Sequence, residues 1–132
     1  MNGKDLIEQT LLEEEGEILD NKDYVFYIRG RELKKSPHIH FKSKEEPNNS
    51  SKLKPGNPYD GCVSLNYYGY FDHHPHFGRL PRKDWKFIVE NLGNNDFFKF
   101  VLNEWNRWNQ NYVVDIPEDK NELAKLNPYY NK

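Results

Sequence analysis

Stretches of alternating apolar and polar residues predict a β-sheet in the first half of the chain. The run 24–28 (YVFYI) is dense in residues that favour strands, and the turn-like run 20–23 separates it from residues 18–19. These two segments predict a hairpin. A third strand is expected over 38–44, and a fourth, the longest, over 61–71. Together they predict a three- or four-stranded antiparallel sheet.

Each predicted strand has one apolar side, because side chains point alternately to the two faces of a sheet. In the third strand Ile39 and Phe41 point to one side. The other side carries His38, His40 and Lys42. In the fourth strand one side is expected to carry Val63, Leu65, Tyr67 and Phe71, and the other Cys62, Ser64, Asn66, Tyr68 and Tyr70. The histidines are therefore expected on the face opposite the core.

Helical periodicity begins after the fourth strand. Leu80-Pro81 precedes apolar residues at i, i+3, i+4 and i+7 over 82–92, and Gly93 ends this run. Asn94 or Asn95 can cap a further helix over 95–110. We expect both helices to pack on the apolar face of the sheet, which makes the fold class α+β.

The two ends and the middle of the chain carry weaker signals. Asn2 can cap an acidic N-terminal helix over 1–16. Residues 45–58 (EEPNNSSKLKPGNP) have the composition of a long mobile loop. Residues 112–116 predict a terminal strand, and 117–132 an irregular tail with at most a short helix.

Composition fits one domain over residues 1–132. The chain has a mass of 15.9 kDa, and aromatic residues make up 15% of it, which is enough for a sizeable core. No apolar run approaches the roughly 18 residues that span a bilayer, so we expect a cytoplasmic protein without a membrane partner. The one cysteine, Cys62, excludes an intrachain disulfide and a zinc site built from cysteines.

Charge is unevenly distributed along the chain. Residues 1–20 hold one lysine against seven acidic residues, whereas residues 22–54 hold nine basic residues against four acidic ones. The first segment can be an acidic arm for a basic partner, and the second a basic hairpin for nucleic acid. We favour mutual neutralisation within the fold, because phosphate-binding domains usually carry net positive charge, and this chain has a net charge of -2.

Five histidines occur in only two places, PHIH (37–40) and DHHPH (72–76). His38 and His40 at i and i+2 of a strand project to one side about 7 Å apart, close enough to share a cation when a third ligand closes the site. The candidates for that ligand are His74, His76 and Asp72. Such a site suits a divalent transition metal such as zinc, iron or manganese.

Two other interpretations of the histidines stay open. His38 or His40 can act as a general acid or base without metal, as in RNA cleavage. Alternatively, the histidines are structural and hydrogen-bond on a wet face of the sheet or against the first helix, and DHHPH is only a polar turn. No glutamate lies at a spacing tied to the histidines, so a hydrolase lacks a visible general base.

Four further residues are candidates for ligand binding. Lys42, Lys44 and Arg79 are placed to hold phosphate, and Tyr68 can stack on a base. Cys62 has no base pattern nearby and is most simply a half-buried small residue.

The order of three segments resembles a bacterial family, domain of unknown function 4160. The segments are PHIHF (37–41), GRLPRKDWKFIVENL (78–92) and NEWNRWN (103–109), within residues 24–109. By position, His38 and His40 match the histidine pair of the family, and Gly78, Leu80 and Pro81 match its helix-opening segment. The resemblance implies a toxin-antitoxin, defence or counter-defence setting, since genes of the family often stand beside such partners. It implies no reaction.

Two hypotheses on function follow. The first is a small cytosolic interaction protein of a bacterial or phage toxin-antitoxin, defence or counter-defence system that binds a protein or nucleic-acid partner. The alternative is a histidine-dependent hydrolase or nuclease, with or without a metal, centred on His38 and His40.

Overall fold

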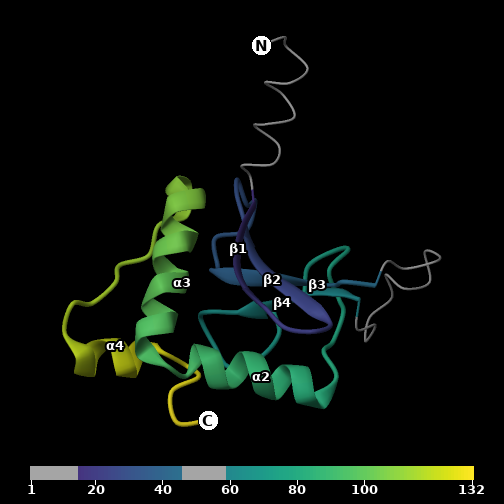
Figure 1. Cartoon of the computed structure of the whole chain (residues 1–132). Coiled ribbons are helices and arrows are strands. Elements are labelled where there is room, and N and C mark those ends of the chain that lie inside the picture. The colour runs from purple at the N-terminus through teal and green to yellow at the C-terminus, as the bar shows by residue number, and fades with distance from the viewer. Residues whose placement is uncertain (1–14, 46–58) are drawn as a thin grey trace, which may run out of the picture.

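A single antiparallel sheet forms the centre of the molecule (Figure 1). The computed structural model describes residues 15–45 and 59–132. The strands follow one another in chain order across the sheet: β1 (Glu15–Asp20), β2 (Tyr24–Arg29), β3 (His38–Ser43) and β4 (Asp60–Ser64). The predicted α+β class with an antiparallel sheet is confirmed, and the number of strands is four.

The described residues also form three α-helices, namely α2 (Arg82–Leu92), α3 (Asn95–Trp108) and α4 (Lys120–Leu126), with a 3-10 turn, η2 (Gln110–Tyr112), after α3. The helix predicted over 82–92 matches α2, and the one predicted over 95–110 ends earlier, at Trp108. The Asn94 side chain caps α3 by accepting hydrogen bonds from two backbone N–H groups of its first turn. Among the described helices, none has the length and apolar composition needed to cross a membrane.

The core lies between the sheet and the helices. Its largest fully buried side chain is Trp105 of α3, and Phe26 of β2 packs against Phe87 of α2 with ring centroids 6.0 Å apart. Each such aliphatic or aromatic side chain contributes about 1.5–3 kcal/mol when fully buried. In β3, Ile39 and Phe41 are buried in this core. The apolar side predicted for the third strand is therefore confirmed.

The strand predicted over 61–71 is wrong in its extent. β4 ends at Ser64, and the chain then turns back along it, so that Phe71 N donates a hydrogen bond of 2.9 Å to Cys62 O. The turn is set by the Ser64 hydroxyl, which accepts two backbone N–H bonds, and by Gly69, whose φ of 142° suits glycine. As a result, Tyr70 lies on the core side and Phe71 on the histidine side, opposite to the prediction.

The C-terminal segment predicted as an irregular tail is well packed. It contains α4, and the Tyr129 side chain is 1% exposed. The Tyr129 hydroxyl donates to Ser64 O over 2.6 Å and accepts from Gly69 N over 3.3 Å. The end of the chain thus holds the turn that follows β4.

Two further predictions at the ends of the chain need correction. The acidic helix predicted over 1–16 does not reach its predicted end, because Glu15 and Gly16 belong to β1, and the rest of it lies outside the described residues. The terminal strand predicted over 112–116 does not form. Instead, the Asn106 amide satisfies both the N–H and the C=O of Val114, in place of a neighbouring strand. Of the loop predicted over 45–58, residues 46–58 also lie outside the description.

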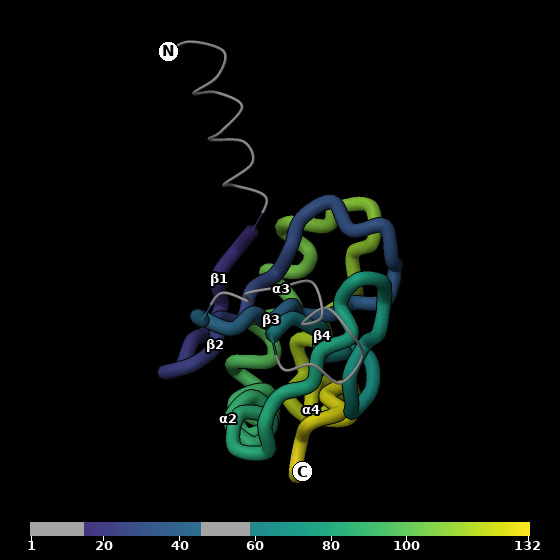
Figure 2. The backbone as a smooth tube through the Cα atoms, turned by 90° about the vertical axis from the view of Figure 1, so that its right-hand side faces the viewer, coloured from purple at the N-terminus to yellow at the C-terminus, as the bar shows by residue number. Residues whose placement is uncertain are grey.

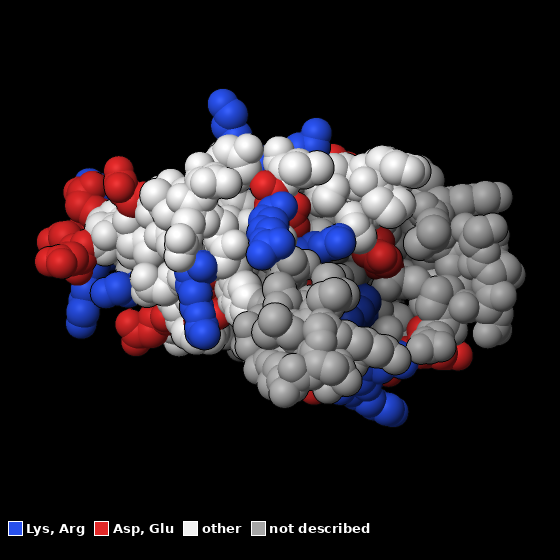
Figure 3. Space-filling view, turned by 90° about the horizontal axis from the view of Figure 1, so that it is seen from above, with Lys and Arg blue, Asp and Glu red and all other residues white. Residues whose placement is uncertain are grey.

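Opposite charges on neighbouring strands pair with each other. Lys42 lies 3.6 Å from Glu15, and Lys44 lies 2.9 Å from Asp20. Acidic and basic side chains are also interspersed on the face shown in Figure 3. These contacts fit the expected neutralisation between the acidic and basic segments.

Two loops cover the face of the sheet that carries the histidines. The loop between β2 and β3 and residues 72–76 of the loop between β4 and α2 line one cavity. The two loops lie next to each other in Figure 2. His38 and His40 are each 0% exposed beneath them. The histidine face is therefore a second, small interior and not a wet surface.

Candidate metal centre

The register between β3 and β4 brings Cys62 to the histidines. In this antiparallel pair His40 lies directly opposite Cys62, and both side chains point to the covered face. The Cys62 sulfur is 3.3 Å from His40 Nδ1. His38, two residues earlier on β3, lies beside His40 with ring centroids 5.1 Å apart.

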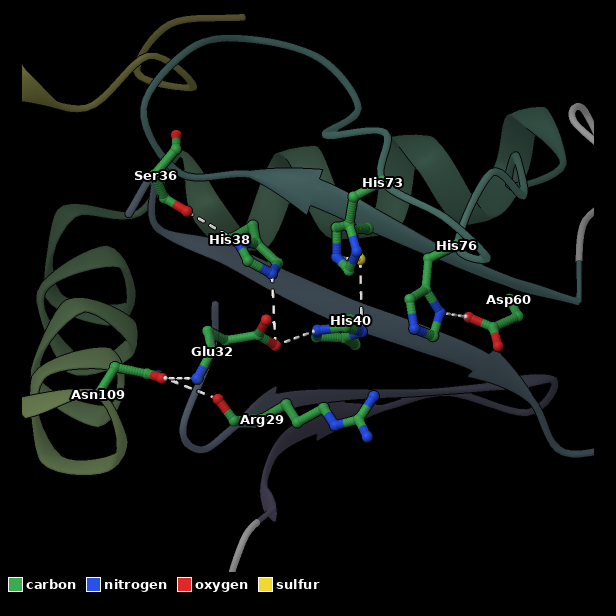
Figure 4. A network of polar contacts seen from close by, with 10 residues as sticks. Arg29, Glu32, Ser36, His38, His40, Asp60, His73, His76 and Asn109 are labelled. Atoms are coloured by element: carbon green, nitrogen blue, oxygen red, sulfur yellow. Dashed lines mark hydrogen bonds and ion pairs between the residues drawn. The ribbon is translucent and has the colours of Figure 1, made fainter. Parts of the chain in front are cut away.

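The fourth member of the cluster is His73, from the loop after β4. The backbone bond from Phe71 to Cys62 fixes the start of this loop, and His73 Nε2 lies 3.4 Å from the Cys62 sulfur. One nitrogen or sulfur atom from each of His38, His40, Cys62 and His73 lies within 4.8 Å of all the others. Figure 4 shows the three imidazole rings turned toward one another.

These distances suit a tetrahedral metal ion. Zinc binds sulfur at about 2.3 Å and nitrogen at about 2.0–2.1 Å, which places two tetrahedral ligand atoms roughly 3.5 Å apart. The two sulfur-to-nitrogen distances are 3.3 and 3.4 Å. A hydrogen bond of the thiol to either ring has a similar length, but one thiol proton can serve only one of the two rings at a time.

Outer hydrogen bonds orient two of the rings. His40 Nε2 lies 2.7 Å from a Glu32 carboxylate oxygen, and His38 Nδ1 lies 2.8 Å from Ser36 O. Both oxygens can only accept, so each of these nitrogens carries the proton, as assigned from its partner. The other nitrogen of each ring then presents a lone pair to the cluster. Metal-bound histidines usually have a carboxylate or carbonyl in this outer position.

One buried atom of the cluster has no hydrogen bond. His38 Nε2 finds no partner among the described residues, and the nearest Glu32 oxygen is 3.5 Å away, beyond a good hydrogen bond. A lone pair and a carboxylate oxygen repel each other unless a proton or a cation lies close by. A buried polar atom without a partner costs free energy, and a metal ion would remove that cost.

Glu32 is held in place by Asn109, the residue that directly follows α3. Its backbone N–H donates to the Asn109 side chain over 2.8 Å, and the same side chain donates to Arg29 O. Arg31, just before it, has a φ of 56°, which bends the loop back over the sheet. Burial acts to raise the pKa of the Glu32 carboxyl, but the neighbouring His38 and His40 outweigh burial and lower it below its usual range.

The two histidines with shifted pKa values are in the protonation state that a metal ligand needs, whereas the thiol is not. Burial and the neighbouring histidines lower the pKa of His73 to about 4, and burial also lowers the pKa of His40. Both imidazoles are therefore neutral near pH 7, as a ligand must be. Burial raises the pKa of the Cys62 thiol, so a metal ion would have to displace its proton on binding.

The same atoms also resemble a nucleophile, base and orienting acid. Cys62, His40 and Glu32 follow one another at 3.3 and 2.7 Å, the order found in cysteine hydrolases. However, Cys62 is 1% exposed, its pKa is raised, and it does not line the neighbouring cavity. A catalytic thiol needs access to a substrate, which Cys62 lacks, so its burial favours a metal ligand over a nucleophile.

The structure brings together only part of the predicted ligand set. His38 and His40 lie in the cluster, whereas His76 Nδ1 bonds Asp60 at 2.6 Å, with its ring against His40. Asp72 pairs with Arg79 through two bonds of 2.7 Å. His74 is exposed beside Phe77.

The four predicted binding residues have separate surroundings. Lys42 and Lys44 pair with acids of β1, and Arg79 pairs with Asp72 and covers the Tyr70 ring. Tyr68 is half-exposed and accepts a hydrogen bond from Trp85 Nε1.

Sequence reasoning missed three residues of the site. Cys62 has no partner nearby in sequence, because His40 reaches it across strands. His73 could not be distinguished from its neighbours, because the path of the DHHPH turn decides which ring points inward. Glu32 had one signal, as the only acidic residue among the basic ones of 29–35.

No protein-family model, curated protein or solved structure matches the chain. The resemblance to domain of unknown function 4160 stays a prediction.

Proposed function

We propose that the protein is a zinc-binding domain whose centre is formed by His38, His40, Cys62 and His73. The observation that carries the proposal is the convergence of four donor atoms from three chain segments within 4.8 Å. Three of these residues are at most 1% exposed. Burying a polar atom without a partner is unfavourable, and His38 Nε2 has no hydrogen bond among the described residues.

The donor set selects the kind of metal. Imidazole and thiolate together suit zinc, whereas calcium and magnesium prefer oxygen. Four protein ligands complete a tetrahedron, which is typical of structural zinc sites. Such an ion would link β3, β4 and the loop after β4, and so stabilise the histidine face.

Metal analysis of paired histidine variants tests the proposal. Tag-free protein, purified without nickel and reconstituted with zinc, should hold about one zinc per chain by mass spectrometry. His73→Ala should lose it. His74→Ala is the matched control, since it removes an exposed imidazole from the same turn, and should keep it. Metal-free wild-type protein, or equal zinc in both variants, contradicts the proposal.

Cobalt substitution tests the sulfur ligand. Cobalt(II) bound to a thiolate has a charge-transfer absorption in the near ultraviolet, and this band should appear in the wild type and vanish in Cys62→Ser. If the band is absent from cobalt-loaded wild-type protein, Cys62 is not a ligand. If metal-free protein instead reacts rapidly with iodoacetamide at Cys62, the nucleophile arrangement gains support.

Both sequence-based hypotheses are compatible with a zinc-stabilised domain and stay predictions. For an interaction protein, the test is a pull-down of a specific partner from the native host. For a hydrolase centred on His38 and His40, it is loss of activity in the doubly substituted variant.

A further inference from the structure

A cavity of about 540 Å³ adjoins the metal centre. Its walls are residues 29–34, from the last residue of β2 and the loop after it, and residues 72–76 from the loop after β4. His73, one of the four donors, and Glu32, the outer partner of His40, both line this cavity. The cavity therefore opens directly beside the buried cluster.

The acidic groups of the lining are already engaged. Glu32 accepts from His40, and Asp72 is paired twice with Arg79, which lies outside the lining. No ion pair or side-chain hydrogen bond of Arg29 or Lys34 occurs within the described part of the chain. The cavity thus has a surplus of positive charge.

Arg29 lines the cavity from the end of β2. In Figure 4 its side chain runs below the ring of His40, and its guanidinium points away from Glu32. Burial raises the pKa of Tyr27 and of Cys62, whereas the positive charge of Arg29 acts to lower both pKa values. These two residues flank His40 on the neighbouring strands. Arg29 is an exposed residue, so its charged group is open to an anion that enters the cavity.

We propose that this cavity is a binding site for a phosphate group, either free phosphate or the terminal phosphate of an ester. A guanidinium binds two phosphate oxygens with its planar fork, and the lysine supplies a second positive charge from the same loop. The volume leaves room for a group attached to the phosphate. This inference goes beyond the proposed function and does not depend on the metal.

Calorimetric titration of the full chain with inorganic phosphate and with phenyl phosphate, at constant ionic strength, tests the site. We expect saturable binding of one ligand per chain. Arg29→Gln should weaken it about tenfold or more, because a charge-assisted bidentate contact is lost. Arg82→Gln on α2 removes the same charge from an exposed position outside the cavity, and should leave the affinity unchanged.

The outcomes separate the two proposals, because zinc is measured on the same samples. Tighter binding of phenyl phosphate identifies an ester site, and equal or tighter binding of inorganic phosphate identifies a free-phosphate site. No saturable binding of either probe, or equal affinity in Arg29→Gln and wild type, overturns the inference even if zinc is present. If circular dichroism shows that Arg29→Gln is unfolded, Lys34→Gln replaces it with an expected loss of about threefold or more.

Discussion

Replacing Glu32 with glutamine should weaken zinc binding while the fold stays intact. The Glu32 carboxylate lies 2.7 Å from His40 Nε2, and its side chain is only 7% exposed, so this is a buried, charge-assisted hydrogen bond. Glutamine keeps an acceptor oxygen of similar shape and removes the charge. The change therefore isolates the effect of the carboxylate on the basicity of the imidazole that faces the metal.

The size of the effect follows from the hydrogen-bond energies. A bond to a charged group contributes about 1.5–3 kcal/mol, and a neutral one about 0.5–1.5 kcal/mol. The difference, about 1–1.5 kcal/mol, corresponds to a roughly 5- to 12-fold weaker zinc affinity. This range overlaps the loss of about 10–100-fold typical for outer partners of metal-bound histidines.

Competition with a chromophoric chelator measures this affinity in the folded protein. Glu104→Gln is the control, since Glu104 accepts from Trp108 on α3, is also largely buried and carries the same charge. Zinc affinity of Glu32→Gln within threefold of the wild type would refute the reasoning. So would an equal loss in Glu104→Gln, because the effect would then come from general charge or stability.

Three further predictions concern stability. Tyr129→Phe should lower the free energy of unfolding by about 1–3 kcal/mol in urea titrations, because Ser64 O loses a buried donor; an unchanged midpoint would contradict this. Asn109→Ala should lower the free energy of unfolding by a similar amount and should also weaken zinc binding, since it releases the backbone of Glu32. Chelator competition on the folded variant measures the change in zinc binding. Burial raises the pKa of Tyr24 to about 12 from an ordinary value of 10.0. The buried neutral phenol therefore stabilises the fold fully below pH 10, and this stabilisation falls as the pH rises toward 12. Unfolding monitored with phenolate absorbance should show the loss, and a flat profile would argue against it.

Local patterns predicted most of the fold. Period-two alternation placed Ile39 and Phe41 in the core, and helical periodicity gave both ends of α2. The failure over 61–71 has a physical cause. The aromatic residues within 67–71 favour strands. The Ser64 hydroxyl and Gly69 nevertheless turn the chain back, and the distant Tyr129 hydroxyl holds that turn.

The candidate site was only half predictable for a related reason. His38 and His40 are two residues apart, so their common direction follows from strand geometry alone. Cys62 joins them through the register between β3 and β4, which no local pattern specifies. Glu32 depends on a loop that bends back over the sheet, and this path is fixed by the distant Asn109.

The pairing of His40 with Cys62 has a consequence for folding and for evolution. A slip of β4 by one residue would place Gly61 or Val63 opposite His40 and turn the sulfur to the other face. Only one alignment of the two strands can thus assemble the four donors, and a bound ion would select that alignment from its competitors. The distance along the chain between the strands does not enter this geometry, so their connection is free to change in length, whereas an insertion inside either strand would dismantle the centre.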